Sequence, residues 1–438
     1  MRISHDAIQK PNWTPLLDGI ARREALTSIR EISTSLAATF EAEYRASIEG
    51  QEISPNAEPY LGTGAAGIAL FFAYLRASGL YNPTLDLSSD YLAFAIEAAA
   101  TRLMGPSLYN GFTGIAWAAQ HISQLQGGVS DDVDEDVDNI LYKYLCKSPW
   151  IEDYDLINGL AGLALYCLER SESPIAKHSL EIIVEHLSEL AVRSQDVVAW
   201  FHHVNLFVNN KQRETYPNGY YNLGLAHGAA GVIALLGRIH ACGIAQEQTG
   251  WLAERAARWL LQQRLPAGFR SWFPGLIDGN KVPVDCRLAW CHGDAGIAAG
   301  LLTVARCVGS NVLADEALAV ARHAAMREPA TAGVEDCCFC HGSSGLAHTF
   351  NRIYHATGDE LFADASRFWF ERTLQFREPG NGAAGYSVWI PNDEGQRGIV
   401  QSANIIDGIA GVGLALIAAI TDVQPNWDRI FLLDIPNT

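Results

Sequence analysis

This sequence of 438 residues lacks several features of secreted, membrane-embedded and nucleic-acid-binding proteins. The N-terminal stretch MRISHDAIQKPNWTPLLDG has no apolar run of signal-peptide length, and no run of about 18 apolar residues occurs anywhere. Positive charge is scarce, because 31 Lys and Arg stand against 49 Asp and Glu, which gives a net charge of −18. We therefore expect a cytoplasmic protein with no membrane span and no nucleic-acid partner.

The cysteines do not form a disulfide framework. There are nine of them, an odd number, at irregular spacings. In a chain without a signal peptide, this pattern predicts reduced thiols. Three of the nine fall, with a histidine, in the short stretch CCFCHGSSG at residues 337–345. This local concentration has three readings: metal ligands, a redox device or small core residues.

A glycine pair organises the whole chain. The unit G-x-x-G, followed by a small and apolar run, occurs seven times, and its first glycines are Gly64, Gly111, Gly159, Gly228, Gly293, Gly342 and Gly408. Three of the gaps are close to 48 residues, enough for two helices and two connections. The run after each pair is apolar on all sides, whereas the linking segments are amphipathic. We expect an all-α protein, a closed α/α toroid with the apolar helices inside and all glycine pairs at one end.

The repeats predict one domain over residues 1–438. The repeats occupy about 55–425 and a helical segment precedes them at 1–54. The longer gaps are rich in aromatic residues and are interrupted by Gly and Pro, which predicts short excursions from the toroid. We expect β-hairpins at 271–284 and 385–400, and an irregular or partly β insertion at 194–222.

Four repeats carry unusual polar residues at or before the glycine pair. These are Asp155, His227, Arg287, Cys291, His292, Cys340 and His341. A single G-x-x-G is usually only a helix-entry turn, so the function depends on these additional residues. If the inner helices all begin on one rim, the seven side chains converge around one end of the toroid. Two thiolates and one imidazole would then form a three-ligand zinc site with an open fourth position, the catalytic pattern for that metal.

The motifs WCHGDAG, CHGSSG and AHGAAG resemble those of the lanthionine synthetase C-like family, which includes lanthipeptide cyclases. The resemblance covers roughly residues 55–425 and implies an α/α toroid of seven inner and seven outer helices. It implies one zinc ion per chain, with Cys291, Cys340 and His341 as ligands. It also implies catalytic roles for His227, Asp155 and Arg287. His292 stands where some family members have tyrosine and others histidine.

The family reaction is Michael addition of a peptide cysteine thiol to dehydroalanine or dehydrobutyrine, which forms a (methyl)lanthionine thioether ring. A free thiol is mostly protonated at neutral pH, and zinc binding would make it a thiolate. The attack generates an enolate that needs stabilisation and a proton. His227 is the first candidate for acid and base, and His292 the second. Arg287 either stabilises the enolate or pairs with Asp155, and Asp155 orients either His227 or Arg287.

The expected substrate is a dehydrated precursor peptide with leader and core segments, and the acidic surface would suit a cationic core. The segment before the first repeat is too short for a dehydratase domain, so a separate dehydratase is expected. The resemblance also implies an exporter and a peripheral location at the inner membrane. One alternative is the addition of glutathione or another small thiol to dehydroamino acids, and another is a non-catalytic zinc-containing peptide-binding protein. A carbohydrate-active α/α barrel is less consistent, because Asp155, Asp294 and Asp407 make no clear carboxylate pair.

The remaining candidates are expected to have structural roles rather than functional ones. Cys337 and Cys338 are expected to be packing or bystander thiols in the loop before the rim. His348 lies two turns beyond His341 on one helix face, where a core position is more consistent than a place on the cavity wall. His202 and His203 are expected on the surface of the insertion.

Overall fold

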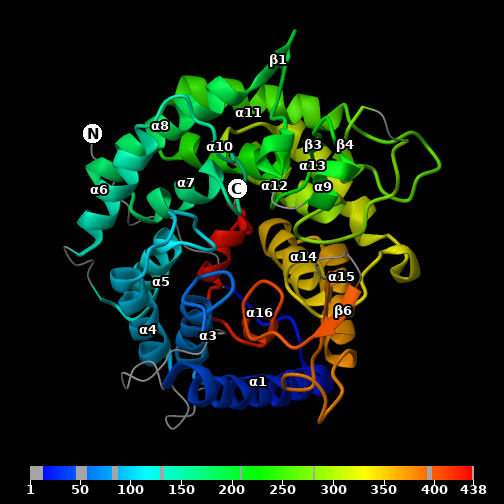
Figure 1. Ribbon diagram of the computed structural model, residues 1–438. Helices are drawn as coiled ribbons and strands as arrows, with labels where there is room; N and C mark the ends of the chain where they lie inside the picture. Colours follow the sequence, from blue (N-terminus) through cyan, green and yellow to red (C-terminus); the bar gives the residue numbers. More distant parts are fainter. Residues whose placement is uncertain are drawn as a thin grey trace, which may run out of the picture.

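The computed structural model describes residues 13–45, 57–80, 87–128, 133–207, 210–279, 282–391 and 397–436. It is a closed ring of helices in two concentric layers (Figure 1). The inner helices are α3 (Ala65–Ala77), α5 (Phe112–Leu125), α7 (Leu160–Glu169), α10 (Ala229–Ala241), α12 (Asp294–Cys307), α14 (Ser343–Thr357) and α16 (Ile409–Ile420). The outer helices are α1 (Gly19–Thr39), α4 (Ser88–Thr101), α6 (Val133–Leu145), α8 (Pro174–Leu190), α11 (Gln246–Leu261), α13 (Asn311–Ala325) and α15 (Glu360–Gln375). The predicted α/α toroid of seven inner and seven outer helices is confirmed.

Composition explains which helices lie inside. Every residue of α16 is buried, and the inner helices are apolar around most of their circumference. Outer helices bury only one face, as in α11, where charged residues alternate with a buried stripe. Each inner helix packs against the next, and α16 packs against α3, so that the ring closes without an exposed end.

The outer partner of the last inner helix comes from the start of the chain. Helix α1 packs against α16 and α15, and a short π-helix, η1 (Phe40–Tyr44), extends it. Of the predicted N-terminal helical segment, residues 1–12 and 46–54 lie outside the described residues. Helix α1 therefore completes the outer layer beside α16, so that the first and last helices of the ring are in contact.

The glycine pairs are required by close backbone approach. A Cβ atom added to Gly293 would lie 2.0 Å from the carbonyl oxygen of Arg287. One added to Gly296 would lie 2.1 Å from the carbonyl oxygen of Trp290, and one added to Gly345 1.7 Å from that of Phe339. The chain before each inner helix thus folds back tightly over the first helical turn, and only glycine leaves room for it. This turn places the residues just before each pair on the rim.

The excursions contain three two-stranded sheets. The strands are β1 (Val192–Ser194), β2 (Val197–Ala199), β3 (Tyr221–Asn222), β4 (Leu276–Ile277), β5 (Val388–Pro391) and β6 (Arg397–Val400). Antiparallel pairs form between β1 and β2, between β3 and β4, and between β5 and β6. A 3-10 turn, η3 (Val204–Leu206), and a short helix, α9 (Asn210–Thr215), complete the insertion. A second 3-10 turn, η4 (Pro329–Thr331), follows α13.

One hairpin prediction agrees with the structure and one is wrong. The pair β5–β6 falls in the predicted stretch 385–400, with residues 392–396 outside the described part. The stretch 271–284 does not form a hairpin on itself among its described residues, because β4 pairs with β3 of the distant insertion. The Asp-Gly dipeptide indicates only a local turn. The pairing of β3 with β4 joins segments more than 50 residues apart, which a local pattern does not reveal.

The C-terminal segment fills the centre of the ring (Figure 1). The 3-10 helix η5 (Asn426–Phe431) accepts a hydrogen bond from Tyr109 Oη at the Ile430 carbonyl, 2.6 Å away, and one from Trp290 Nε1 at the Phe431 carbonyl, 2.8 Å away. The Phe431 ring packs 4.3 Å from the Phe339 ring, measured between centroids. The bore is therefore a packed core that closes the glycine-pair end from below.

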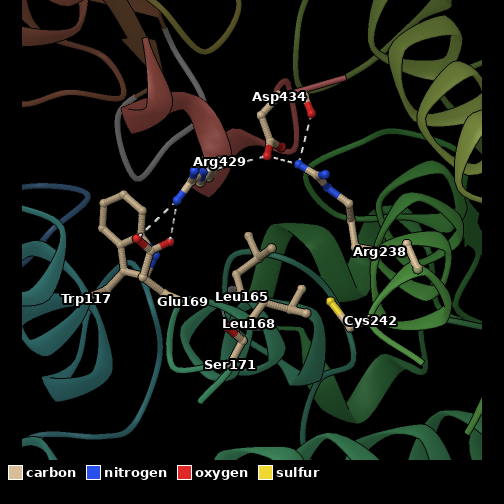
Figure 2. A pocket seen from close by; sticks show the side chains of 10 residues that line it. Trp117, Leu165, Leu168, Glu169, Ser171, Arg238, Cys242, Arg429 and Asp434 are labelled. Carbon is tan, nitrogen blue, oxygen red and sulfur yellow. Dashed lines mark hydrogen bonds and ion pairs between the residues drawn. The ribbon is translucent and has the colours of Figure 1, made fainter. Parts of the chain in front are cut away.

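Buried charges anchor this segment. Asp428 is fully buried and binds His348 Nε2 at 2.7 Å and the guanidinium of Arg352. His348 is consequently a core residue with a structural partner. At the end of the ring away from the glycine pairs, Glu169, Arg429, Asp434 and Arg238 form a continuous ion-pair chain (Figure 2). Among the described helices, none combines the length and apolarity needed to cross a membrane.

Candidate metal and acid–base site

The site is built on equivalent positions of successive repeats. Cys291 and Cys340 each lie two residues before the first glycine of their pair, as do Ala226 and Ile406. Backbone hydrogen bonds join these positions around the rim: the Ala226 amide donates to the Cys291 carbonyl (3.3 Å), Cys291 to Cys340 (3.2 Å), and Cys340 to Ile406 (2.9 Å). The shared register therefore places two cysteines, 49 residues apart in sequence, side by side.

The two thiols interact directly. A hydrogen bond from the Cys340 thiol, helped by nearby positive charge from His341 and Arg287, lowers the pKa of Cys291 to about 7 despite burial. The same hydrogen bond and burial raise the pKa of Cys340. The hydrogen bond thus favours the thiolate at Cys291 and the protonated thiol at Cys340. Thiolate character of this kind is what soft metal ions and electrophiles require.

His341 occupies the position directly after Cys340 and is held by an acidic neighbour. Its Nε2 lies 3.6 Å from Asp336 Oδ2 and 3.4 Å from the Trp389 carbonyl oxygen. Asp336 is buried and also accepts a hydrogen bond from the Trp389 amide at 3.0 Å. Burial lowers the pKa of His341, but the carboxylate of Asp336 outweighs it and the net pKa is raised. The β5 strand thus fixes one side of this imidazole.

Two groups of possible donors converge on His341. Potential ligand atoms of Cys340, His341 and Asp407 lie within 4.8 Å of one another, and so do those of Asp336, Cys338 and His341. Cys291 joins through its contact with Cys340. In this structure the imidazole faces Asp336 and Trp389, so the complete trio of Cys291, Cys340 and His341 stays a prediction. The donor set itself, two contacting thiols with an adjacent imidazole, is the set that zinc prefers.

His227 and Asp155 form the second part of the site. His227 precedes the glycine pair of α10, and its Nδ1 lies 2.5 Å from Asp155 Oδ2. Asp155 is fully buried before α7, and its other oxygen accepts the amide of Asn158 at 2.6 Å. Burial lowers the pKa of His227, but the Asp155 carboxylate reverses the effect and raises it. Of the two predicted partners of Asp155, the structure therefore pairs it with His227.

Arg287 and His292 line the same cavity, which has a volume of about 270 Å³ and also includes His227, Cys291, Cys340 and His341. The Arg287 side chain is exposed, and within the described ranges no hydrogen bond or ion pair holds its guanidinium. Burial lowers the pKa of His292 to about 3, and its Nδ1 has no hydrogen-bond partner in the described residues. His292 is therefore neutral at physiological pH, 6.3 Å from the His227 ring between centroids.

Six of the seven predicted site residues line this cavity, and Asp155 lies behind His227. Sequence reasoning missed Asp336, Asp407 and Trp389 as neighbours of the site. Asp407 had a usable signal, because it stands one residue before its glycine pair, as His227, His292 and His341 do. Trp389 had none, since it reaches the site from a strand outside the repeats. Cys337 and Cys338 are fully buried, and none of the nine cysteines forms a disulfide.

The prediction for His202 is wrong. This side chain is buried, with Nε2 3.6 Å from Asp153 Oδ2 and its ring stacked on Tyr220. His203 is exposed, as predicted. The insertion therefore contributes a packed layer beside Asp155 rather than a solvent-exposed loop. Asp153 is half-buried, and desolvation with the nearby Asp155 raises its pKa to about 7.

Comparison with known proteins places this α/α toroid in a family. The family described as lanthionine synthetase C-like protein matches residues 55–432, which is most of the chain, and the chain belongs to that family. The nisin biosynthesis protein NisC of Lactococcus lactis subsp. lactis is 25% identical over 309 residues, covering 65% of this chain and 71% of the relative. The solved structure of a nisin cyclase superposes with a TM-score of 0.69 at 21% identity, covering 92% of this chain and 97% of that chain. The structural match supports the fold.

Proposed function

We propose that this protein is a zinc-dependent lanthipeptide cyclase, which adds peptide cysteine thiols to dehydroalanine or dehydrobutyrine. The observation that carries the proposal is the convergence of a hydrogen-bonded thiol pair and a histidine–aspartate pair on one cavity. Membership in the lanthionine synthetase C-like family and the similarity to a nisin biosynthesis protein support the same reaction. The substrate would be a dehydrated precursor peptide made by a separate dehydratase in the cytoplasm and passed to an exporter.

We propose Cys291, Cys340 and His341 as the residues that hold zinc. Asp336 would fix the orientation of His341, as carboxylates commonly do behind a metal-bound histidine. When bound, zinc supplies Lewis acidity that keeps a substrate thiol deprotonated at neutral pH. The buried floor of Trp290, Phe339 and Phe431 excludes water from below, which strengthens electrostatic interactions at this end of the ring.

The reaction joins the substrate sulfur to the β-carbon of the dehydroamino acid. The thiol gives up its proton, the carbon–carbon double bond becomes an enolate, and the α-carbon then takes a proton. The product therefore has the same mass as the substrate. No oxidant or co-substrate is required.

His227 is suited to deliver that proton. Asp155 holds Nδ1 and raises the pKa, which leaves Nε2 as the proton-bearing atom facing the cavity. His292 is a poor donor, because its pKa of about 3 keeps it neutral. Arg287 has no other ion-pair partner among the described residues and supplies a positive charge for the enolate oxygen.

The proposal is tested with a dehydrated peptide that bears one cysteine and one dehydroalanine. Because cyclisation does not change the mass, the product is detected by alkylation with N-ethylmaleimide before mass spectrometry. Wild-type protein should protect the peptide from alkylation, and the protein without metal should not. A second reaction uses a cysteine-free dehydrated peptide with glutathione. Adduct formation there, without ring formation in the first reaction, would favour the small-thiol alternative and overturn the proposal.

A further inference from the structure

A second cavity opens beside the site. It has a volume of about 420 Å³ and shares Arg287 and His292 with the smaller cavity that contains the thiols. Its walls come from the segment between β4 and α12 and from Tyr216 of the insertion. The two cavities therefore adjoin, and the side chains between them have proposed roles in the reaction.

The walls of this cavity are apolar although they face solvent. Val282 is 82% exposed and Val284 69% exposed, and the adjoining β4 residues Leu276 and Ile277 are half-buried. Pro274 and Pro283 add further apolar surface. Exposed apolar side chains gathered around one cavity indicate a surface that is covered during function.

The charged side chains that line this cavity are Asp278, Asp285 and Arg287. Asp285 Oδ1 accepts the backbone amides of Arg270 at 2.6 Å and Ser271 at 3.0 Å. Asp278 also lines the cavity. Two carboxylates against one guanidinium leave a net negative charge beside the apolar wall, which disfavours acidic side chains more than neutral or basic ones.

The packed centre of the ring limits the paths that a bound peptide can take. The segment containing Phe431 fills the bore beneath the thiols, so no chain can pass through the ring. A peptide whose cysteine reaches Cys291 and Cys340 must continue along the rim. The apolar cavity adjoins the site in that direction, beyond Arg287 and His292.

We propose that this cavity is a specificity subsite for the side chain adjacent to the reacting cysteine of the substrate peptide. It selects apolar residues and rejects acidic ones. This inference rests on the proposed function, because it assumes a cysteine-bearing peptide as the ligand. Contact with Val282 and Val284 supplies part of the binding free energy, while the chemistry stays with His227 and the thiol site.

Binding and turnover are measured separately to test it. Fluorescent peptides carry alanine in place of dehydroalanine, so that they cannot react, and differ only in having Leu, Ser or Asp next to the cysteine. One series varies the preceding residue and a second the following residue. Fluorescence anisotropy gives the Kd for the wild type, for the double variant Val282→Ser/Val284→Ser and for Val312→Ser. Val312 is 77% exposed on outer helix α13 and serves as the matched control.

Wild-type protein should bind the Leu peptide about tenfold more tightly than the Ser peptide in at least one series, since the cavity covers only part of a side chain, and it should bind the Asp peptide more weakly than either. The double variant should lose the preference for Leu over Ser, and Val312→Ser should keep it. Equal affinity for all peptides, or an unchanged preference in the double variant, overturns the inference even if the wild type forms rings. A preference that disappears only in the double variant supports the subsite even if no ring forms, a result that would count against the proposed function alone.

Discussion

The two ends of the toroid carry cavities of similar size but opposite character. The cavity at the glycine-pair end has a volume of about 270 Å³ and the one at the other end about 280 Å³. At the far end the charges of Glu169, Arg429, Asp434 and Arg238 neutralise one another (Figure 2). At the glycine-pair end, an exposed Arg287 and an unpartnered His292 nitrogen face the thiols. The two cavities are therefore similar in volume, but they differ in whether their polar groups are paired.

This contrast separates charges that stabilise the fold from groups available for chemistry. The far network holds the C-terminal segment in the bore, and that segment in turn supports the floor of the site. Substitutions at the glycine-pair end should therefore change the rate of the reaction, and substitutions at the far end should change the stability of the folded chain.

Replacement of His227 should give the largest loss of rate among the acid–base and supporting residues. His227→Asn removes the proton donor, and we expect kcat for ring formation to fall by about 10²- to 10⁴-fold. Metal content and the thermal midpoint should stay close to wild type. A fall of less than threefold would contradict the role assigned to His227 and direct attention to His292.

Replacement of Asp336 should have a smaller effect. Asp336→Asn removes the carboxylate 3.6 Å from His341 Nε2 while preserving the shape of the side chain. We expect zinc affinity to fall by about 10- to 100-fold, measured by competition with a chromophoric chelator. Activity should return when zinc is supplied in excess. Failure of excess zinc to restore activity in a folded variant would argue against a positioning role.

Replacement of Asp155 should move the pH dependence. The carboxylate raises the pKa of His227 above 6.5, so the wild-type donor stays protonated to higher pH. In Asp155→Asn, burial alone acts on His227, and the alkaline limb of the kcat profile should shift down by about one pH unit or more. The limb that moves is decisive, because a downward shift of the acid limb with an unmoved alkaline limb would mean that His227 acts as the base.

The predictability of the fold depended on periodicity. Seven recurring glycine pairs were enough to predict two layers of helices, because the close backbone approach requires glycine at the same positions in every repeat. Helix α1 beside α16 and the plug formed by η5 were not predicted, because both lie outside the repeat and depend on long-range packing. The pairing of β3 with β4 was missed for the same reason.

The site was partly predictable for a related reason. Cys291 and Cys340 occupy one position before the glycine pair, and His227 and His292 occupy the next, so the repeat that revealed the fold also brought them together. Asp336 and Trp389 lie outside that register and meet His341 only through the β5 excursion. His202 was misplaced because the packing of the insertion against Asp153 depends on the three-dimensional fold.

The far-end network should have the smallest effect on the reaction. Asp434→Asn leaves the guanidinium of Arg238 without its carboxylate partner, although the Asp434 carbonyl still accepts one hydrogen bond at 2.9 Å. We expect the free energy of unfolding to fall by about 2 kcal/mol and kcat to stay within twofold of wild type at low temperature. A large loss of kcat in a stably folded variant would show that the two ends are coupled in the reaction.

The central claim is that the thiol pair at the glycine-pair end holds a catalytic zinc ion. The most direct test is the zinc content of purified protein, measured together with ring formation, for wild type, Cys291→Ala, Cys340→Ala and the buried control Cys337→Ala. The account predicts about one zinc per chain and full protection from alkylation in the wild type and in Cys337→Ala. Both should be lost in Cys291→Ala and in Cys340→Ala. Retention of zinc and ring formation in either of these two variants would contradict it.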